Sequence, residues 1–196
     1  MLSQFKKYIQ DKTKINDEQF DLIAPELSSK RIKKDSVLLR EGDMCSQGYF
    51  VTKGLLRAYT IDDAGKEHII QFAPEDAWIT DRNSLFFDQP AMFYIDAIED
   101  SEVVIMGKEF DEKAEKIIPG FNKFTIRILH NFIRFMQKRL SMLLGATAEQ
   151  RYLDFIELYP NLTLRVPQWM IASYLGITPE SLSRVRKELA HKNFKH

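Results

Sequence analysis

The segment IASYLGITPESLSRVRKEL, residues 171–189, predicts two helices with almost nothing between them. Gly176 is suited to end the first helix, because glycine takes the left-handed conformation of a C-terminal cap without steric cost. Thr178 is a typical N-cap residue, and Pro179 is favoured as the first residue of a helix. The two helices must therefore pack against each other across a turn of three residues.

The second helix of this pair has one apolar face and one polar face. Leu182, Val185 and Leu189 share the apolar face, whereas the opposite face is short, basic and rich in serine. This division is typical of a helix-turn-helix, whose second helix enters the major groove of DNA by its first turns. Arginine can bind guanine through two hydrogen bonds, and glutamate can accept one from cytosine. The candidate DNA contacts are Thr178, Glu180, Ser181, Ser183, Arg184 and Lys187.

The charge of the chain is balanced in total and uneven along its length. The formal net charge is zero, but residues 163–196 carry an excess of four positive charges. A basic end favours a polyanion partner, although a solvated tail would look the same on charge alone.

Residues 36–106 differ from what precedes them. Residues 1–35 look helical and amphipathic, whereas 36–106 contain short β-branched and aromatic runs separated by turn sequences such as DDAGK and DQP. Short strands at this spacing predict an antiparallel barrel or roll. Residues 107–118 predict a short helix that ends before Pro119 and Gly120.

The longest helical pattern runs from about Gly120 to Leu144 and carries two apolar series. The first is Phe121, Ile128, Phe132, Phe135 and Met142, and the second is Leu129, Ile133, Met136, Leu140 and Leu143. A helix with two apolar faces is either buried within one chain or packed on a second copy of itself. We expect a homodimer, with Phe121, Ile128, Phe132, Phe135 and Met136 at its interface. Thr147 and Gln150 then form a capping box that opens the next helix.

The order of roll, long helix and helix-turn-helix resembles the Crp/Fnr superfamily of bacterial transcription regulators. The motifs LLREGD…GYFVTKGLLRAY and LGITPESLSRVRKEL carry the likeness. It implies an α+β fold with a β-roll at 1–118 that senses an effector or serves as a scaffold, a dimerisation helix at 119–146 and a DNA-binding domain at 147–196. Glu180 and Arg184 match the common base readers of the family. The β-hairpin wing that usually follows the recognition helix is short or absent here.

The same resemblance locates the position of a cyclic nucleotide. In such members a Gly-Glu pair holds the ribose, and an Arg-Ser pair about ten residues later holds the phosphate. Thr80-Asp81 and Ala91-Met92 stand at these positions, so the phosphate-binding charge is missing. We therefore expect no tight binding of cyclic AMP. Candidate ligand contacts are Asp81, Arg82, Ser84 and Met92, although solvent-facing loop residues are the favoured interpretation of Arg82 and Ser84.

Other chemistries find little support in the sequence. Cys45 is the single cysteine, too few for an iron–sulfur cluster. His68 or His130 could supply an axial ligand to a haem, but a lone histidine is more often structural or exposed. No set of residues suits a metal site or an enzyme. No cofactor is expected. With no signal peptide or membrane span, we expect a cytoplasmic protein whose partners are double-stranded DNA, a second copy of itself and RNA polymerase, with an unknown small-molecule effector left open. The alternative is a small-molecule or cyclic-nucleotide-binding module that signals through protein–protein contacts.

Overall fold

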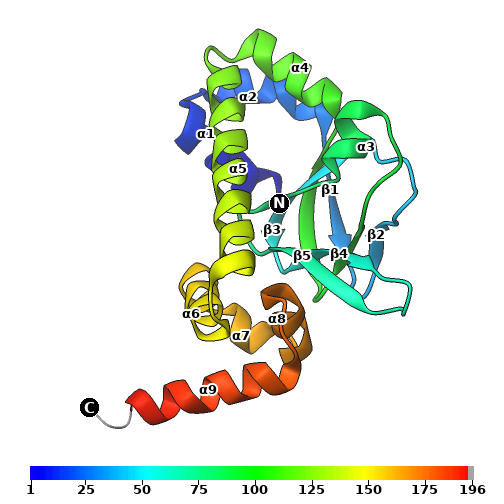
Figure 1. The fold of residues 1–196 in the computed structure, drawn as a ribbon. Coiled ribbons are helices and arrows are strands. Elements are labelled where there is room, and N and C mark those ends of the chain that lie inside the picture. The colour runs from blue at the N-terminus through cyan, green and yellow to red at the C-terminus, as the bar shows by residue number, and fades with distance from the viewer. Residues whose placement is uncertain (194–196) are drawn as a thin grey trace. The chain divides into compact units, whose positions relative to one another are not determined.

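The computed structural model describes residues 1–193 (Figure 1). The chain begins with a β-roll and its flanking helices and continues into a part that consists of helices. The chain forms two compact units that divide inside α5: Met1–Ile128, and a second unit that starts at Leu129. The helices are α1 (Leu2–Thr13), α2 (Asp17–Ile23), η1 (Ala24–Glu26), α3 (Arg82–Phe87), α4 (Lys108–Ile117), α5 (Phe121–Gly145), α6 (Ala148–Leu158), α7 (Leu162–Arg165), α8 (Gln168–Leu175) and α9 (Pro179–Asn193). Within this described range, none of the helices has the length and apolar character of a membrane span.

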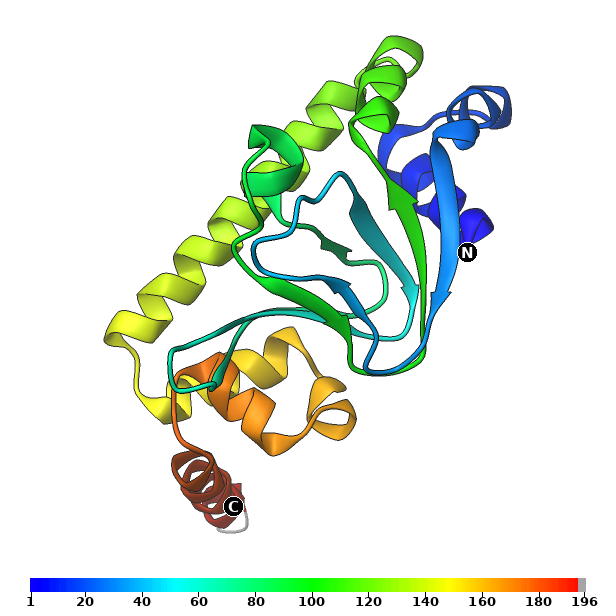
Figure 2. The same cartoon turned by 90° about the vertical axis from the view of Figure 1, so that its right-hand side faces the viewer.

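The β-roll consists of two four-stranded antiparallel sheets (Figure 2). One sheet has the order β1-β8-β3-β6 and the other β2-β7-β4-β5. The predicted β-roll is therefore confirmed. The strands are β1 (Leu27–Ile32), β2 (Val37–Leu39), β3 (Gly48–Lys53), β4 (Leu56–Ile61), β5 (Glu67–Ala73), β6 (Trp78–Ile79), β7 (Tyr94–Ala97) and β8 (Ser101–Met106).

The helical prediction for residues 1–35 is wrong at its end. Leu27–Ile32 forms β1, which pairs with β8 in a register that sets Leu27 opposite Met106 and Ile32 opposite Ser101. Only the two end residues of β1 are buried, and the four residues between them are polar and exposed. The strand exists because it pairs with β8, far away in sequence, and its own residues give no alternating pattern.

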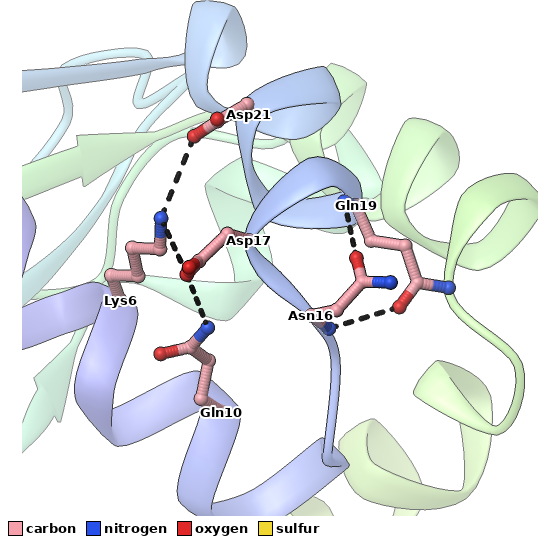
Figure 3. A network of polar contacts seen from close by, with 6 residues as sticks. All are labelled: Lys6, Gln10, Asn16, Asp17, Gln19 and Asp21. Atoms are coloured by element: carbon pink, nitrogen blue, oxygen red, sulfur yellow. Dashed lines mark hydrogen bonds and ion pairs between the residues drawn. The ribbon is translucent and has the colours of Figure 1, made fainter.

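Polar contacts cap α2 and tie it to α1 (Figure 3). The amide of Gln19 donates to the side chain of Asn16 over 2.8 Å, and the side-chain oxygen of Gln19 accepts from the Asn16 amide over 3.1 Å. This capping box satisfies two backbone donors that a helix start leaves open. Lys6 of α1 lies 2.9 Å from Asp17, and Gln10 donates to the same carboxylate over 3.0 Å. Because these contacts between α1 and α2 are exposed, they orient the two helices but contribute little to the free energy of folding.

Two apolar clusters hold the first unit together, one on each face of the sheet that contains β3 and β8. Tyr49 and Val51 point between the two sheets, where they meet residues of β4 and β7. Phe50 and Val104 point to the other face, against the helices α1, α2 and α4 and the start of α5. This face is rich in aromatic rings at edge-to-face or tilted angles, such as Phe5 and Phe50 with centroids 5.1 Å apart.

Candidate nucleic-acid interface and ligand position

The turn between α8 and α9 is a Schellman motif. Gly176 has φ of 65°, its amide donates to the carbonyl of Ser173, and the amide of Ile177 donates to the carbonyl of Ala172 over 3.0 Å. The hydroxyl of Thr178 then accepts from the amide of Ser181 over 3.2 Å, which caps α9. Three residues thus separate the two helices, as the sequence predicts, because each end is closed by its own local hydrogen bonds.

The packing between α8 and α9 leaves the polar face of α9 outside. Leu182 is 1% exposed, and Ala172 of α8 is equally buried, so the helices cross closely at a small residue. Val185 is also buried, and Leu189 is half-buried. Five of the six candidate DNA contacts are exposed: Thr178, Glu180, Ser183, Arg184 and Lys187. The structure therefore brings them together on one outward face of the first turns of α9.

Thr178 and Ser181, two of the candidate DNA contacts, also form hydrogen bonds at the start of α9. Ser181 is half-buried, and the Thr178 hydroxyl donates to its side-chain oxygen over 3.2 Å. The pKa of Glu180 is held below its usual value by its own backbone amide and by the Thr178 hydroxyl. This carboxylate is therefore ionised and acts as an acceptor at neutral pH.

Two of the four candidate ligand residues of the roll, Asp81 and Ser84, are engaged in structural hydrogen bonds. Asp81 is fully buried and caps α3: one oxygen accepts from the amide of Ser84 over 2.8 Å, and the other from the amide of Met92 over 2.7 Å. Ser84 is 1% exposed, and its hydroxyl accepts from the amide of Cys45 over 2.6 Å. The interpretation of Ser84 as a solvent-facing loop residue is therefore wrong.

Arg82 and Met92 do not complete a ligand site with these residues. The guanidinium of Arg82 lies over the ring of Phe86, 4.6 Å from its centroid, and Met92 is 56% exposed. Ala91 stands where the resemblance requires an arginine. It is 3% exposed, its amide donates to the carbonyl of Asp43, and its carbonyl accepts from the amide of Gly42. The segment is thus pinned by its backbone and carries no charge for a phosphate.

The prediction that Phe121 lies at the dimer interface is wrong. It is 2% exposed, and its ring meets that of Phe110 edge to face with centroids 5.8 Å apart. Phe135 is half-buried and lines a pocket between α5, α6 and α8. Ile128 and Met136 are half-buried, and Phe132 is 36% exposed. Of the first apolar series, Phe121 is thus part of the core of the first unit and Phe135 lines a pocket of the second unit, whereas Met136 belongs to the second series.

The second apolar series of α5 is the more exposed one. Ile133 is 50% exposed, Leu140 is 58% exposed and Leu143 is 37% exposed. With Leu129 and Met136 they are spaced by four and three residues in turn, which is the heptad spacing of a coiled-coil seam. The signal for this seam was present in the sequence, but it could not be separated from the first series before burial was known.

Two further residues were missed by the sequence analysis, Arg139 of α5 and Arg151 of α6. Arg139 donates to the carbonyl of Tyr174 over 3.0 Å, and Arg151 donates to that of Leu175 over 2.7 Å. No pattern of neighbouring residues in the sequence predicts these bonds, because donor and acceptor are 35 and 24 residues apart. Among the residues that the structure describes, no group of three or more His, Cys, Asp or Glu is arranged to hold a metal ion.

Known proteins resemble this chain over most of its length. The model of the cyclic nucleotide-binding domain family matches residues 29–114. The Anaerobic regulatory protein of Pasteurella multocida (strain Pm70) is 24% identical over 186 residues, which are 87% of this chain and 66% of that protein. The Transcriptional activator protein FnrA of Stutzerimonas stutzeri is 26% identical over 167 residues, 79% of this chain and 67% of that protein. The chain thus spans about two thirds of these regulators.

Solved structures share the fold. FixK2 from Bradyrhizobium japonicum superposes with a TM-score of 0.71 at 22% identity, covering 85% of this chain and 86% of that one. The Catabolite Activator Protein of Thermus thermophilus gives a TM-score of 0.56 at 19% identity, covering 91% and 85%. The domain match, the relatives and the shared fold agree with the motifs of the roll and of the helix-turn-helix. Residues 29–114 match the cyclic nucleotide-binding domain family, and over most of its length the chain is similar to Fnr-type transcription regulators.

Proposed function

We propose that the protein is a sequence-specific DNA-binding regulator that acts as a homodimer on a roughly palindromic operator. The observation that carries this proposal is the outward face of α9, where Glu180, Ser183 and Arg184 are exposed at the start of a helix that follows α8 across a capped three-residue turn. Side chains of these types at the first turns of a helix can reach base edges in the major groove. The relatives that this chain matches are regulators, so a role without enzymatic activity belongs to the same proposal.

The roles within this face follow from chemistry and position. Arg184 has a planar fork suited to guanine, and Glu180 is an ionised acceptor suited to cytosine. Ser183 and Lys187 suit phosphate oxygens, which position the protein without reading sequence. Thr178 and Ser181 bond each other at the helix start, so their share in DNA contact is limited to phosphates near this cap.

We assign the dimer contact to the exposed seam of α5. Ile133, Leu140 and Leu143 place large apolar side chains in water in a single chain, and a second α5 with the same heptad register would cover them. Two copies related by a two-fold axis would present their recognition helices to half-sites centred about 34 Å apart, one turn of DNA.

The roll is proposed to work without cyclic AMP. The carboxylate of Asp81 is fully buried with each oxygen bonded to a backbone amide, and Ala91 offers no positive charge. A cyclic phosphate in this place would lose its hydration and gain no ion pair, which is costly. Another small molecule as effector and RNA polymerase as partner remain parts of the proposal that the family suggests.

The decisive experiment is selection of DNA from a random duplex pool by the purified full chain without added ligand. We expect enrichment of a palindrome, and Arg184→Ala should relax one base position in each half-site at a cost of about 1–3 kcal/mol. Glu188→Ala is the matched control, because Glu188 is exposed on the same helix outside the candidate set. A folded protein that enriches no sequence, alone or with a small-molecule extract of cells, would refute the proposal. Calorimetry with cyclic AMP tests the roll, and micromolar affinity would contradict our interpretation.

A further inference from the structure

The end of α8 has a complete set of hydrogen bonds, and half of them come from other helices. The last four carbonyl groups of an α-helix have no donor within the helix. In α8 these belong to residues 172–175. The turn satisfies the first two, because the amides of Ile177 and Gly176 donate to Ala172 and Ser173. The carbonyls of Tyr174 and Leu175 are left for donors from outside the turn.

Two arginines supply these donors. Arg139 of α5 reaches the Tyr174 carbonyl over 3.0 Å, and Arg151 of α6 reaches the Leu175 carbonyl over 2.7 Å. Each bond has a positively charged donor and lies at the helix end where the macrodipole is negative, so both effects favour it. The Arg139 guanidinium also lies over the ring of Tyr174, 4.1 Å from its centroid.

The turn itself lies close against the same two helices. A Cβ atom at Gly176 would be 3.2 Å from the Leu143 side chain of α5 and 3.4 Å from the Arg151 guanidinium of α6. Lys138 of α5 and Asp154 of α6 form an ion pair between those helices. The hinge of the helix-turn-helix is therefore bonded directly to the C-terminal half of α5, the helix to which we assign the dimer contact.

We propose that Arg139 and Arg151 are positioning residues for DNA recognition, which bind the last two carbonyl groups of α8 and fix the angle of α9 relative to α5. The inference rests on the proposed function. In a dimer joined through α5, this angle sets the distance between the two recognition helices, and this distance must match the spacing of the half-sites. The two arginines thus determine which spacing is read, while Arg184 and Glu180 determine which bases are read.

The test compares binding to duplexes that differ only in spacing. The probes are the palindrome enriched by the unchanged protein, the same palindrome with its half-sites moved by one or two base pairs, and a duplex with one half-site. Arg139→Met and Arg151→Met keep most of the side-chain length and remove the guanidinium. Arg134→Met is the matched control, because Arg134 is exposed on α5.

We expect Arg134→Met to behave like the unchanged protein, with affinity falling at least about tenfold when the spacing is altered, as for a lost specific contact. Arg139→Met and Arg151→Met should lose about tenfold on the native spacing and show a flatter dependence on spacing, with single half-site binding unchanged within about threefold. Arg151→Lys keeps the positive charge but lacks the planar guanidinium group. Its affinity and spacing dependence should therefore lie between those of the unchanged protein and those of Arg151→Met.

Three results would overturn the inference. The first is a folded, dimeric variant with the affinity and spacing dependence of the unchanged protein. The second is an equal loss on the palindrome and on the single half-site, because this marks general damage to the DNA-binding part. The third is unfolding of the Met variants together with an unchanged spacing profile in Arg151→Lys. If the unchanged protein enriches no DNA at all, the proposed function fails, which is a separate result.

Discussion

Replacing Gly54 by alanine tests the close contact that joins two turns of the β-roll. Gly54 lies between β3 and β4 with φ of 92°, a conformation that residues with a side chain rarely adopt. Its amide donates to Glu75 over 2.8 Å, and the next amide, of Leu55, donates to the hydroxyl of Ser101 over 3.1 Å. A Cβ atom at Gly54 would lie 2.7 Å from the Cα of Ser101 and 2.8 Å from the carbonyl oxygen of Asp100.

The expected cost has two parts. The positive φ costs an alanine about 1–2 kcal/mol. The overlap with backbone atoms costs about a further 1–3 kcal/mol, because neither the Cα nor the carbonyl can move without shifting the start of β8. Gly65 offers a matched control: its φ is 80°, but a Cβ there would meet nothing within 4 Å. Gly65→Ala should therefore show the first part alone, about 1–2 kcal/mol.

The free energy of unfolding is measured for both variants by urea titration in a Trp169→Phe background, in which the fluorescence of Trp78 reports on the first unit. The difference between the two variants isolates the overlap, since both carry the cost of positive φ. We expect Gly54→Ala to be less stable than Gly65→Ala by about 1–3 kcal/mol. Equal losses would refute the close approach of the β3–β4 turn to Ser101.

The remaining predictions concern the core, the seam and one half-buried acid. Phe121→Ala should destabilise the first unit by about 3–5 kcal/mol in urea titration and leave the dimer dissociation constant unchanged, because Phe121 is a core residue. Ile133→Ala should instead weaken dimerisation by about 3 kcal/mol, about a hundredfold in sedimentation, and leave unfolding of the first unit unchanged. Burial raises the pKa of Asp111 to about 6, with Arg82 partly opposing this and Glu115 adding to it. Because this folded pKa exceeds the unfolded value, the folded state holds the proton more tightly, and stability falls as pH rises from about 4 to about 6. Asp111→Asn should remove this slope and, after allowance for partial exposure, stabilise the protein at pH 7 by about 1–2 kcal/mol; an unchanged slope would contradict this assignment.

The features that could be predicted from sequence depend on residues close together in the chain. The turn at Gly176 follows from glycine, a cap and a proline within four residues. The capping box of Thr147 and Gln150 is confirmed, with the Thr147 hydroxyl accepting from the Gln150 amide over 3.2 Å. In each case the residues that form the hydrogen bonds are also the residues that carry the sequence signal.

The features that could not be predicted depend on partners far away in the chain. Strand β1 needs β8, and its polar residues 28–31 show no alternation of their own. The arginine bonds to α8 join residues 35 and 24 positions apart. The two apolar series of α5 share one helix and one composition. Only the burial of Phe121 by Phe110 shows that the first series begins in the core of the first unit.

Hydrogen bonding separates the polar residues that hold the fold from those that can bind a partner. Asp81 is a good candidate ligand residue by sequence, yet both of its oxygens are engaged by backbone amides and none of its surface is exposed. Moving it toward a ligand would leave the buried Ser84 amide and the part-buried Met92 amide unpaired, at about 1–3 kcal/mol for each buried group. Arg184 has the opposite situation, exposed on a helix whose other face is packed. Binding through Asp81 would break hydrogen bonds that hold the roll, whereas binding through Arg184 uses a side chain that is already exposed. For this reason we assign recognition to α9.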